Sequence, residues 1–401
     1  MSGDRIITRD FLLNTVNAFC GSFTYFILTA SIASYAMWRY GVSTTEAGLA
    51  TGLFVLSGLL SRLLLGRFIE SVGRKKTLIA AIIAAMVASL LYFTTETFLL
   101  LLVVRVIHGA AYSLCNSTTN DIITKMLPVE RRGEGLGYFL LSVTLSTAIG
   151  PYLALLFVGV DAYNMVFTIC IIANLVSLLI VLIMKVAEEE LTPEQKKAVR
   201  QMKLRDIFYL PAVPQSIVNM LLMLSYSGVM SFIAVYSKSI GLNDVAMYFY
   251  VAYSASTVVS RFTVGKIFDT KGANYVMIPG YVAFISGMLI YSQAVSSAVF
   301  IIPGVLMGFA ISTVFPTSQT MIMRDVHPHK FGSAVSTFQS ITDIGTGFGP
   351  MIIGAIIAST GYRHTYLICA AIATFSFLMY WVTYGRKNRI RGTSSLPDIQ
   401  D

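Results

Sequence analysis

Three ionisable side chains, Arg105, His108 and Asp343, stand inside long apolar stretches of this chain. If those stretches cross a bilayer, a charge at the centre costs from about 2.5 to more than about 10 kcal/mol, so it faces a partner or water rather than lipid. A desolvated carboxylate can hold a proton near neutral pH and release it when water arrives. Asp343 is therefore a candidate for proton exchange. Its alternative is a structural role, pinned to an arginine or to backbone donors.

Arg105 and His108 lie three residues apart and would share one face of a helix. Arg105 is too costly to expose to lipid, so it either faces a wet cavity or caps neighbouring carbonyl oxygens. His108 either changes its charge near physiological pH or stays neutral and hydrogen-bonded. The sequence alone leaves these alternatives open.

The elements that hold these residues are apolar runs long enough to cross a membrane. Hydrophobic residues make up 55% of the 401 residues and charged residues 12%, against about 25% charged in a soluble domain. A continuous run of about 20 apolar residues spans the hydrocarbon layer as a helix and does not fit a barrel strand. The sequence predicts twelve such spans, at about 11–37, 45–66, 77–95, 98–124, 135–158, 162–184, 211–236, 245–267, 274–294, 297–322, 332–358 and 362–384.

The two halves of the chain repeat each other. Residues 61–73 read SRLLLGRFIESVG and residues 260–272 read SRFTVGKIFDTKG, an offset of 199 residues. The same offset carries Gly109 onto Gly308. A duplicated and highly apolar chain predicts an all-α membrane protein built from two pseudo-symmetric six-helix bundles.

The longest polar stretch lies between the two halves. We expect bundles at 1–184 and 211–385, a linker at 185–210 and a polar tail at 386–401. The formal net charge is +9, and all but four of the 29 Lys and Arg fall near the side that holds both termini. That asymmetry follows the positive-inside rule, so it places both termini in the cytoplasm and gives no reason to expect a nucleic-acid partner.

A loop rich in glycine and basic residues joins the second and third spans. It contains Gly66, Glu70, Gly73, Arg74 and Lys75. Gly66 permits close helix approach, Gly73 permits a tight turn, and Arg74 can bond acceptors at neighbouring helix ends. The alternative is an ordinary positive-inside loop, although the second half repeats the pattern in weaker form. The loop resembles the cytoplasmic signature G-x-x-x-D-x-x-G-R-[RK] of the major facilitator superfamily, with Glu70 where Asp is usual.

This resemblance covers all twelve spans and implies the major facilitator fold. In that family the loop arginine bonds an acid at the inner end of the fourth span and holds the cytoplasmic side shut. Asp121 occupies that place here, so the resemblance implies an Arg74–Asp121 contact that breaks during transport. It also implies that Arg105 faces a central cavity and relays protons or attracts an anion.

In the family the first, fourth, seventh and tenth spans line the cavity. The lining residues implied here are Asn17, Tyr25, Arg105, Tyr112, Asn116, Asn219, Tyr226 and Phe315. Aromatic rings mixed with amides suit an amphiphilic organic molecule. The fifth span partly matches the family's antiporter signature. The positions at which we expect the helices to bend are Gly150, Pro151, Gly349 and Pro350.

These features predict a secondary transporter, and the resemblance favours a proton-coupled exporter of a small amphiphilic compound, with Asp343, Arg105 and His108 handling the protons. The alternatives are export of a specific metabolite such as a sugar or a metal-chelating compound, uptake by proton symport, and a membrane sensor without flux. No cofactor or metal is expected, and no P-loop, His-rich cluster or nucleophile motif of an enzyme is evident. We expect a monomer in the plasma (inner) membrane of a bacterium, with protons, lipid and a small molecule as partners.

Overall fold

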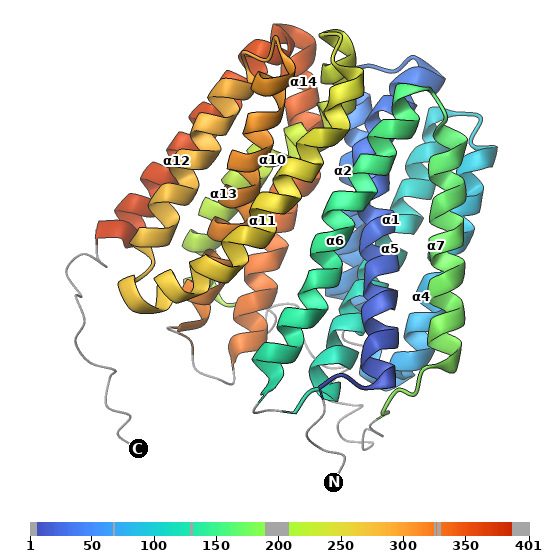
Figure 1. Ribbon diagram of the computed structural model, residues 1–401. Coiled ribbons are helices and arrows are strands. Elements are labelled where there is room, and N and C mark those ends of the chain that lie inside the picture. The colour runs from blue at the N-terminus through green and yellow to red at the C-terminus, as the bar shows by residue number, and fades with distance from the viewer. Residues whose placement is uncertain are drawn as a thin grey trace.

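The structure is a computed structural model that describes residues 6–66, 69–128, 131–188, 208–324, 326 and 330–386. Its regular elements are helices, drawn in Figure 1. They are α1 (Arg9–Tyr40), α2 (Thr44–Leu65), α3 (Ile69–Val72), α4 (Arg74–Leu91), η2 (Tyr92–Thr94), α5 (Phe98–Met126), α6 (Arg132–Gly159), α7 (Tyr163–Ile183), η4 (Leu210–Ala212), α10 (Val213–Ser239), α11 (Asn243–Lys271), α12 (Asn274–Tyr291), α13 (Ser297–Arg324), α14 (Phe331–Tyr380) and η6 (Trp381–Gly385).

Ten candidate spans within the described ranges are long and apolar enough to cross a membrane. The helix α11 has the length, 29 residues, but it is more polar than the others because it carries many Ser, Thr and Tyr side chains. The helix α14 is two helices joined at Gly361, whose φ of 74° interrupts the helical backbone. With α11 and both parts of α14 counted, the expected twelve spans of an all-α membrane protein are confirmed.

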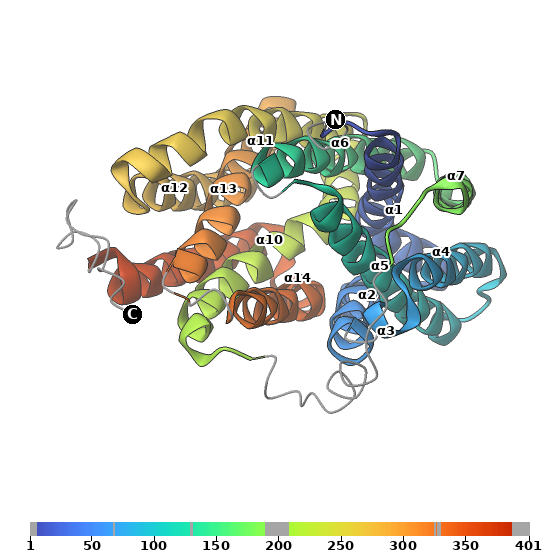
Figure 2. The same cartoon turned by 90° about the horizontal axis from the view of Figure 1, so that it is seen from below.

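The helices form two groups that lie side by side, α1 to α7 and α10 to α14 (Figures 1 and 2). In the first group α1 packs on α6, α2 on α5, and α4 on both α5 and α7. In the second group α10 packs on α14, α11 on α13, and α12 on both α13 and α14. The same pattern of contacts recurs at corresponding places, which confirms the expected pseudo-symmetry of the two bundles.

The repeated glycines mark equivalent close approaches in the two groups. A Cβ atom added to Gly109 of α5 would overlap the carbonyl oxygen of Phe54 in α2. A Cβ atom added to Gly308 of α13 would overlap the carbonyl oxygen of Tyr253 in α11. Both pairs are related by the offset of 199 residues, so the repeat in the sequence preserves the spacing between these helices.

Short capping signals fix the turn between α1 and α2. Gly41 ends α1 with a φ of 64°, a left-handed conformation that glycine adopts without strain. The side chain of Ser43 accepts from the backbone N–H of Glu46, and Glu46 in turn accepts from Ser43, which makes a capping box at the start of α2. This turn aims α2 back through the layer beside α1.

We call the end of the molecule where α1 begins and α2 ends the base, and the opposite end the top (Figure 1). Near the top, α2 packs closely on α14, and on the other face α6 packs on α11. A Cβ atom on Gly52 would overlap the carbonyl oxygen of Gly347, and one on Gly48 would overlap that of Pro350. We name this contact the α2–α14 seam. It comprises Thr44, Gly48, Gly52, Gly347, Pro350 and Gly354.

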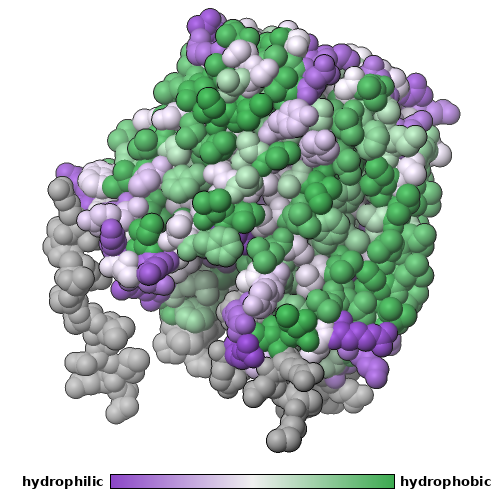
Figure 3. All heavy atoms as spheres, in the orientation of Figure 1, coloured by the Kyte–Doolittle hydropathy of each residue, from purple (hydrophilic) through white to green (hydrophobic). Residues whose placement is uncertain are grey.

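Apolar side chains cover the middle of the face seen in Figure 3, and hydrophilic side chains gather toward its top and bottom. Many large apolar side chains are exposed on the helices, among them Leu99, Leu179, Val259 and Phe262. A surface of this kind fits a hydrocarbon layer and not water.

The expected chain divisions lie partly outside the described residues. Of the linker at 185–210 the structure describes residues 185–188 and 208–210, and of the tail at 386–401 it describes Arg386. The division into two moving units therefore stays a proposal.

Candidate functional site

A cavity of about 390 Å³ lies between the two groups of helices, below the α2–α14 seam. Its lining side chains come from both groups, from α1, α2, α5 and α6 on one side and from α10, α11, α13 and α14 on the other. The lining mixes aromatic rings, hydroxyls and methionines with a few charged groups. This volume falls in the range of sites that hold small organic molecules.

All four aromatic residues expected to line the cavity do so. Tyr25 and Tyr112 stack there with ring centroids 5.1 Å apart, and Tyr226 stacks on Tyr253 at 5.8 Å. Of the expected lining set, the cavity contains Tyr25, Tyr112, Asn116, Tyr226 and Phe315. One stacked pair belongs to the first group of helices and the other to the second, so tyrosine rings line the cavity from both groups.

Asp343 of α14 lines the cavity and is the only one of the three expected coupling residues that does so among the described lining residues. Its Oδ2 accepts a hydrogen bond from Nη2 of Arg62 in α2, so the ion pair joins the two groups of helices. The side chain of Asp343 is 28% exposed and that of Arg62 is 24% exposed, so water reaches both. The pair is the charged link between the groups at the level of the cavity.

A second arginine, Arg261 of α11, also lines the cavity. Arg62 and Arg261 are 199 residues apart and follow Ser61 and Ser260 in the repeated segment. Within the described part of the chain Arg261 has no carboxylate partner, and Nε of Arg62 is buried without a hydrogen-bond acceptor. The cavity thus holds two guanidinium groups and one carboxylate among its described lining residues.

The expectation that Arg105 faces the cavity is wrong. Arg105 is 1% exposed, and its Nε donates to the carbonyl oxygen of Ala50 at 2.9 Å. Its Nη1 donates to the hydroxyl of Tyr92 at 3.2 Å, and its guanidinium lies 4.4 Å from the ring centroid of Phe54. These contacts stabilise the buried charge of Arg105 inside the first group of helices. A carbonyl oxygen, a hydroxyl group and an aromatic ring take the place of water around the guanidinium.

His108 belongs to the same closed cluster. It is 1% exposed, its Nδ1 lies 3.1 Å from the hydroxyl of Tyr92, and it is absent from the described cavity lining. This geometry matches the alternative of a hydrogen-bonded structural histidine. We therefore assign no substrate contact to Arg105 or His108, and their expected part in proton coupling has no path to the cavity through the described contacts.

Two amides expected in the cavity lie in the helix packing instead, which corrects the prediction for Asn17 and Asn219. Asn17 is 0% exposed, donates to Oγ1 of Thr119 at 2.9 Å and accepts from Ser177 at 2.5 Å. Asn219 is 0% exposed and donates to Oγ1 of Thr342 at 3.1 Å. Asn17 joins α1 to both α5 and α7, and Asn219 joins α10 to α14.

The contact between Arg74 and Asp121 is present at the base. Nε of Arg74 lies 2.5 Å from Oδ2 of Asp121, and the Arg74 side chain is 2% exposed. Both residues belong to the first group of helices, on α4 and α5, so the contact does not bridge the groups. Its breaking during transport stays a prediction.

The loop around this ion pair is held by residues that begin the expected linker. Gly73 precedes α4 with a φ of 100°, and the carboxylate of Glu188 accepts from the backbone N–H groups of Arg74 and Lys75 at 2.9 and 2.8 Å. Nζ of Lys75 donates to the carbonyl oxygens of Leu182 and Met184 at the end of α7. Lys75 and Glu188 therefore tie the start of α4 to the end of α7.

The remaining expected residues have simpler surroundings. Gly66 ends α2, and Glu70 lies in α3 with its side chain outside the described part. The described backbone of α6 continues through Gly150 and Pro151, and that of α14 continues through Gly349 and Pro350. Gly150 packs on α1 and Gly349 on α10. Bending at these positions stays a prediction.

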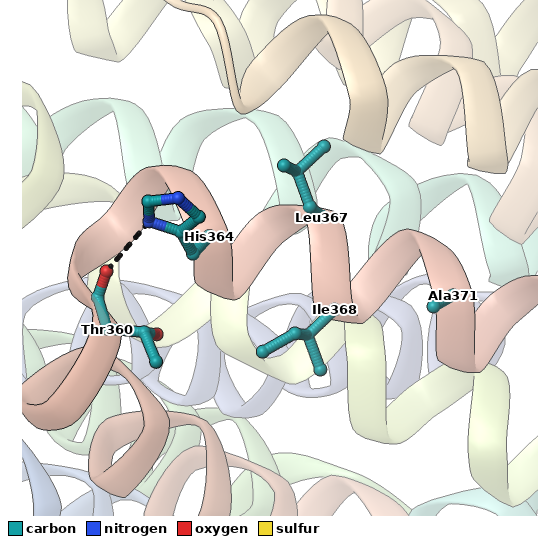
Figure 4. A pocket seen from close by; sticks show the side chains of 5 residues that line it. All are labelled: Thr360, His364, Leu367, Ile368 and Ala371. Atoms are coloured by element: carbon teal, nitrogen blue, oxygen red, sulfur yellow. Dashed lines mark hydrogen bonds between the residues drawn. The ribbon is translucent and has the colours of Figure 1, made fainter.

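A larger hollow of about 690 Å³ lies along the second part of α14 (Figure 4). Its lining residues, Thr360, His364, Leu367, Ile368 and Ala371, all come from this one stretch of helix. Nδ1 of His364 lies 3.1 Å from the carbonyl oxygen of Thr360 in the preceding turn. Because no second element encloses the hollow, the central cavity is the better candidate site.

Arg62 and Arg261 were not among the expected site residues. Both stand near the base, where positive charge follows the positive-inside rule, so a membrane-flanking role accounts for them equally well. The signal that could have found them is the repeat, because Ser-Arg is one of the few polar pairs preserved at the offset of 199 residues. The glycines of the seam, Gly48 and Gly52, also carried no charge or motif to mark them.

Fold and site together define a membrane protein whose two related helix bundles enclose a cavity lined by aromatic and charged groups. The sequence profile of the Major Facilitator Superfamily matches residues 15–345 and 250–397. The chain belongs to this superfamily.

Relatives of similar length have been named in several organisms. The chain is 23% identical over 368 residues to an uncharacterized MFS-type transporter of Methanocaldococcus jannaschii, covering 89% of this chain and 93% of that protein. It is 22% identical over 373 residues to the staphylopine export protein of Staphylococcus aureus, covering 89% and 91%. It is 23% identical over 340 residues to the multidrug resistance protein MdtG of Serratia proteamaculans, covering 81% of each chain.

Among solved structures, the nucleoside transporter NupG has a TM-score of 0.71 at 14% identity, covering 93% of this chain and 99% of that chain. This likeness concerns the fold.

Proposed function

We propose that the protein is a proton-coupled exporter that moves a small amphiphilic compound by alternating access. The observation that carries this proposal is the ion pair between Arg62 and Asp343, which lies in the cavity and joins the two groups of helices. A titratable group in that place can couple its protonation state to the relative position of the two groups.

The described conformation corresponds to the state that faces the base. The α2–α14 seam closes the top, and Lys238 of α10 approaches Asp161 to 3.5 Å across the groups at the same end. The cavity lies below the seam, toward the base. Because basic residues gather at the base, we assign the base to the cytoplasm and place both termini there, in a plasma (inner) membrane.

The proposed cycle uses the two protonation states of Asp343. With Asp343 ionised, its attraction to Arg62 holds α14 to α2, and a substrate enters from the base. Protonation of Asp343 removes the charge and weakens this link, so the balance between the two conformations changes. A proton that enters from outside and leaves to the cytoplasm then drives the substrate outward. The two moving units would be residues 1–184 and 211–385, joined by the linker.

Export is favoured over uptake by the named relatives, one of which exports staphylopine while others are multidrug resistance proteins. The aromatic lining supports an amphiphilic compound, since stacked rings bind flat apolar surfaces. Proton symport remains the alternative that a flux measurement separates, because it requires substrate and proton to move in one direction.

The experiment begins with a thermal-stability screen of purified protein against amphiphilic compounds, since a binder raises the melting temperature by mass action. The binder is then supplied to proteoliposomes under an imposed pH gradient. We expect transport against its own gradient by the wild type and none by Asp343→Asn. Glu96→Gln, which removes an exposed carboxylate from the connection between η2 and α5 at the top, is the control and should transport normally. Undiminished uphill flux in Asp343→Asn would remove that residue from coupling.

A further inference from the structure

The cavity is lined by more positive than negative side chains. Among the described lining residues the charged ones are Arg62, Arg261 and Asp343. Asp343 neutralises Arg62, whereas Arg261 has no carboxylate partner within the described ranges. A guanidinium that faces a cavity without a counter-ion is ready to bind an anionic group, and its planar fork suits a carboxylate.

The Arg62–Asp343 pair is also incomplete. Only Nη2 of Arg62 bonds to the carboxylate, and Nε of Arg62 is buried without an acceptor. An unmet donor of this kind costs free energy that a bound acceptor recovers. Nη1 of Arg62 also has no acceptor among the described residues and is the donor that a second carboxylate can reach, while Oδ1 of Asp343 remains for a cation other than Arg62.

Both guanidinium groups come from equivalent positions of the two bundles. Arg62 reaches the cavity from α2 and Arg261 from α11, in the repeated Ser-Arg pair. One ligand that contacts both would connect the two groups of helices through its own anionic groups. The aromatic pairs Tyr25–Tyr112 and Tyr226–Tyr253 line the same space and would hold its apolar part.

We propose that the transported compound is an amino carboxylate: an aromatic or apolar frame with carboxylate groups for Arg62 and Arg261 and an amine for Asp343. This charge pattern is the complement of the two guanidinium groups and one carboxylate in the cavity. The amine also explains exchange against protons. An ammonium group binds Asp343 only while that carboxylate is ionised, so the proton and the substrate compete for it. This last step rests on the proposed function.

A substrate with carboxylates alone would behave differently. It would draw Arg62 away from Asp343 and leave that carboxylate without a counter-ion, which favours its protonation. Anion and proton would then be bound together and would move in one direction. The amine is thus the feature that distinguishes exchange from symport in this cavity.

The test uses three probes on one frame with purified wild-type protein in chelator-washed, metal-free buffer at neutral pH. N-Benzyliminodiacetate carries an ammonium and two carboxylates, benzylmalonate carries two carboxylates, and benzylamine carries an ammonium. Binding is measured by calorimetry and by the change in melting temperature. We expect N-benzyliminodiacetate to bind at least about tenfold more tightly than benzylamine. Equal affinities for all three probes, or no binding of N-benzyliminodiacetate at millimolar concentration, would overturn the proposal.

Variants identify the groups that bind each charge. We expect Arg261→Gln to weaken the binding of N-benzyliminodiacetate by about tenfold. Arg261→Lys should lose less affinity than Arg261→Gln. Asp343→Asn should weaken the binding of N-benzyliminodiacetate without weakening the binding of benzylmalonate. Arg363→Gln removes an exposed guanidinium of the second group of helices, outside the cavity, and is the matched control. Unaltered binding in Arg261→Gln, with its melting temperature preserved, would contradict the assignment. These are binding measurements, so they can fail while proton-driven flux succeeds, and the reverse also holds.

Discussion

Arg62 and Arg105 show that an arginine within an apolar helix can serve two different purposes. Arg62 faces the cavity, is partly hydrated and pairs with a carboxylate of the other group of helices. Arg105 lies in a closed cluster with Tyr92 and Phe54 inside its own group. The first arrangement can change during a transport cycle, whereas the second fixes the packing of α2 and α5 around a buried charge.

Replacement of Arg105 should therefore affect stability more than binding. In Arg105→Lys the single ammonium group cannot make both the bond to Ala50 and the bond to Tyr92, so one of the two is lost. We expect a loss of about 2–3 kcal/mol in unfolding free energy, since the lost bond has a charged donor. The melting temperature in detergent measures this loss, with the exposed Arg39→Lys as control. The affinity of the folded fraction for a cavity ligand should stay within about twofold of wild type. A large drop in affinity at unchanged stability would show that Arg105 does contribute to the binding site.

At the scale of elements, the α2–α14 seam determines whether the top can close. Gly52 meets the backbone of Gly347 so closely that no side chain fits between them in the described state. We expect Gly52→Val to hold the two helices apart and to favour the conformation that opens at the top. A membrane-impermeant thiol reagent applied from the top should label Met230→Cys in the cavity several-fold faster in this background. Gly137→Val in α6, where a Cβ atom meets no neighbour, is the control. Equal labelling rates would show that the seam is not a gate.

The loop between α2 and α4 provides a second prediction at this scale. Arg74 bonds Asp121 and the carbonyl oxygen of Ala187, so it joins α4, α5 and the segment that follows α7. We expect Arg74→Ala to loosen the base and to raise the rate at which Asn116→Cys is labelled from that side. Lys76→Ala keeps the loop contacts of Arg74 and serves as control. Unaltered accessibility from both sides would remove this contact from gating.

The apolar runs predicted the helices well, because a helix hydrogen-bonds its backbone N–H and C=O groups within one segment, as a lipid environment requires. They could not predict which face of each helix meets the cavity. Helices that are apolar on several sides carry little periodic signal, so Asn17 and Asn219 could not be separated from Tyr25 and Tyr226. The partners of Asp343 and Arg105 depend on helix rotation, which is fixed by close glycine contacts between distant segments. Arg62 was hidden among the basic residues that flank every membrane span.

At the scale of the whole molecule, the two bundles should move as units about the cavity, and the protonation of Asp343 should bias that motion. Closure at the top and a cavity toward the base describe one end of the motion. The other end requires the seam to part and the base to close. This claim can be tested without knowing the substrate, because it concerns distances between helices.

The direct measurement is double electron–electron resonance on two spin-labelled pairs in lipid. Val160→Cys with Val295→Cys reports on the top, and Val72→Cys with Tyr275→Cys reports on the base. All four positions are exposed, and the native cysteines are buried. We predict that Asp343→Asn, which mimics protonation, lengthens the top distance and shortens the base distance. Identical distance distributions in wild type and Asp343→Asn at both ends, across acidic and neutral pH, would contradict the account.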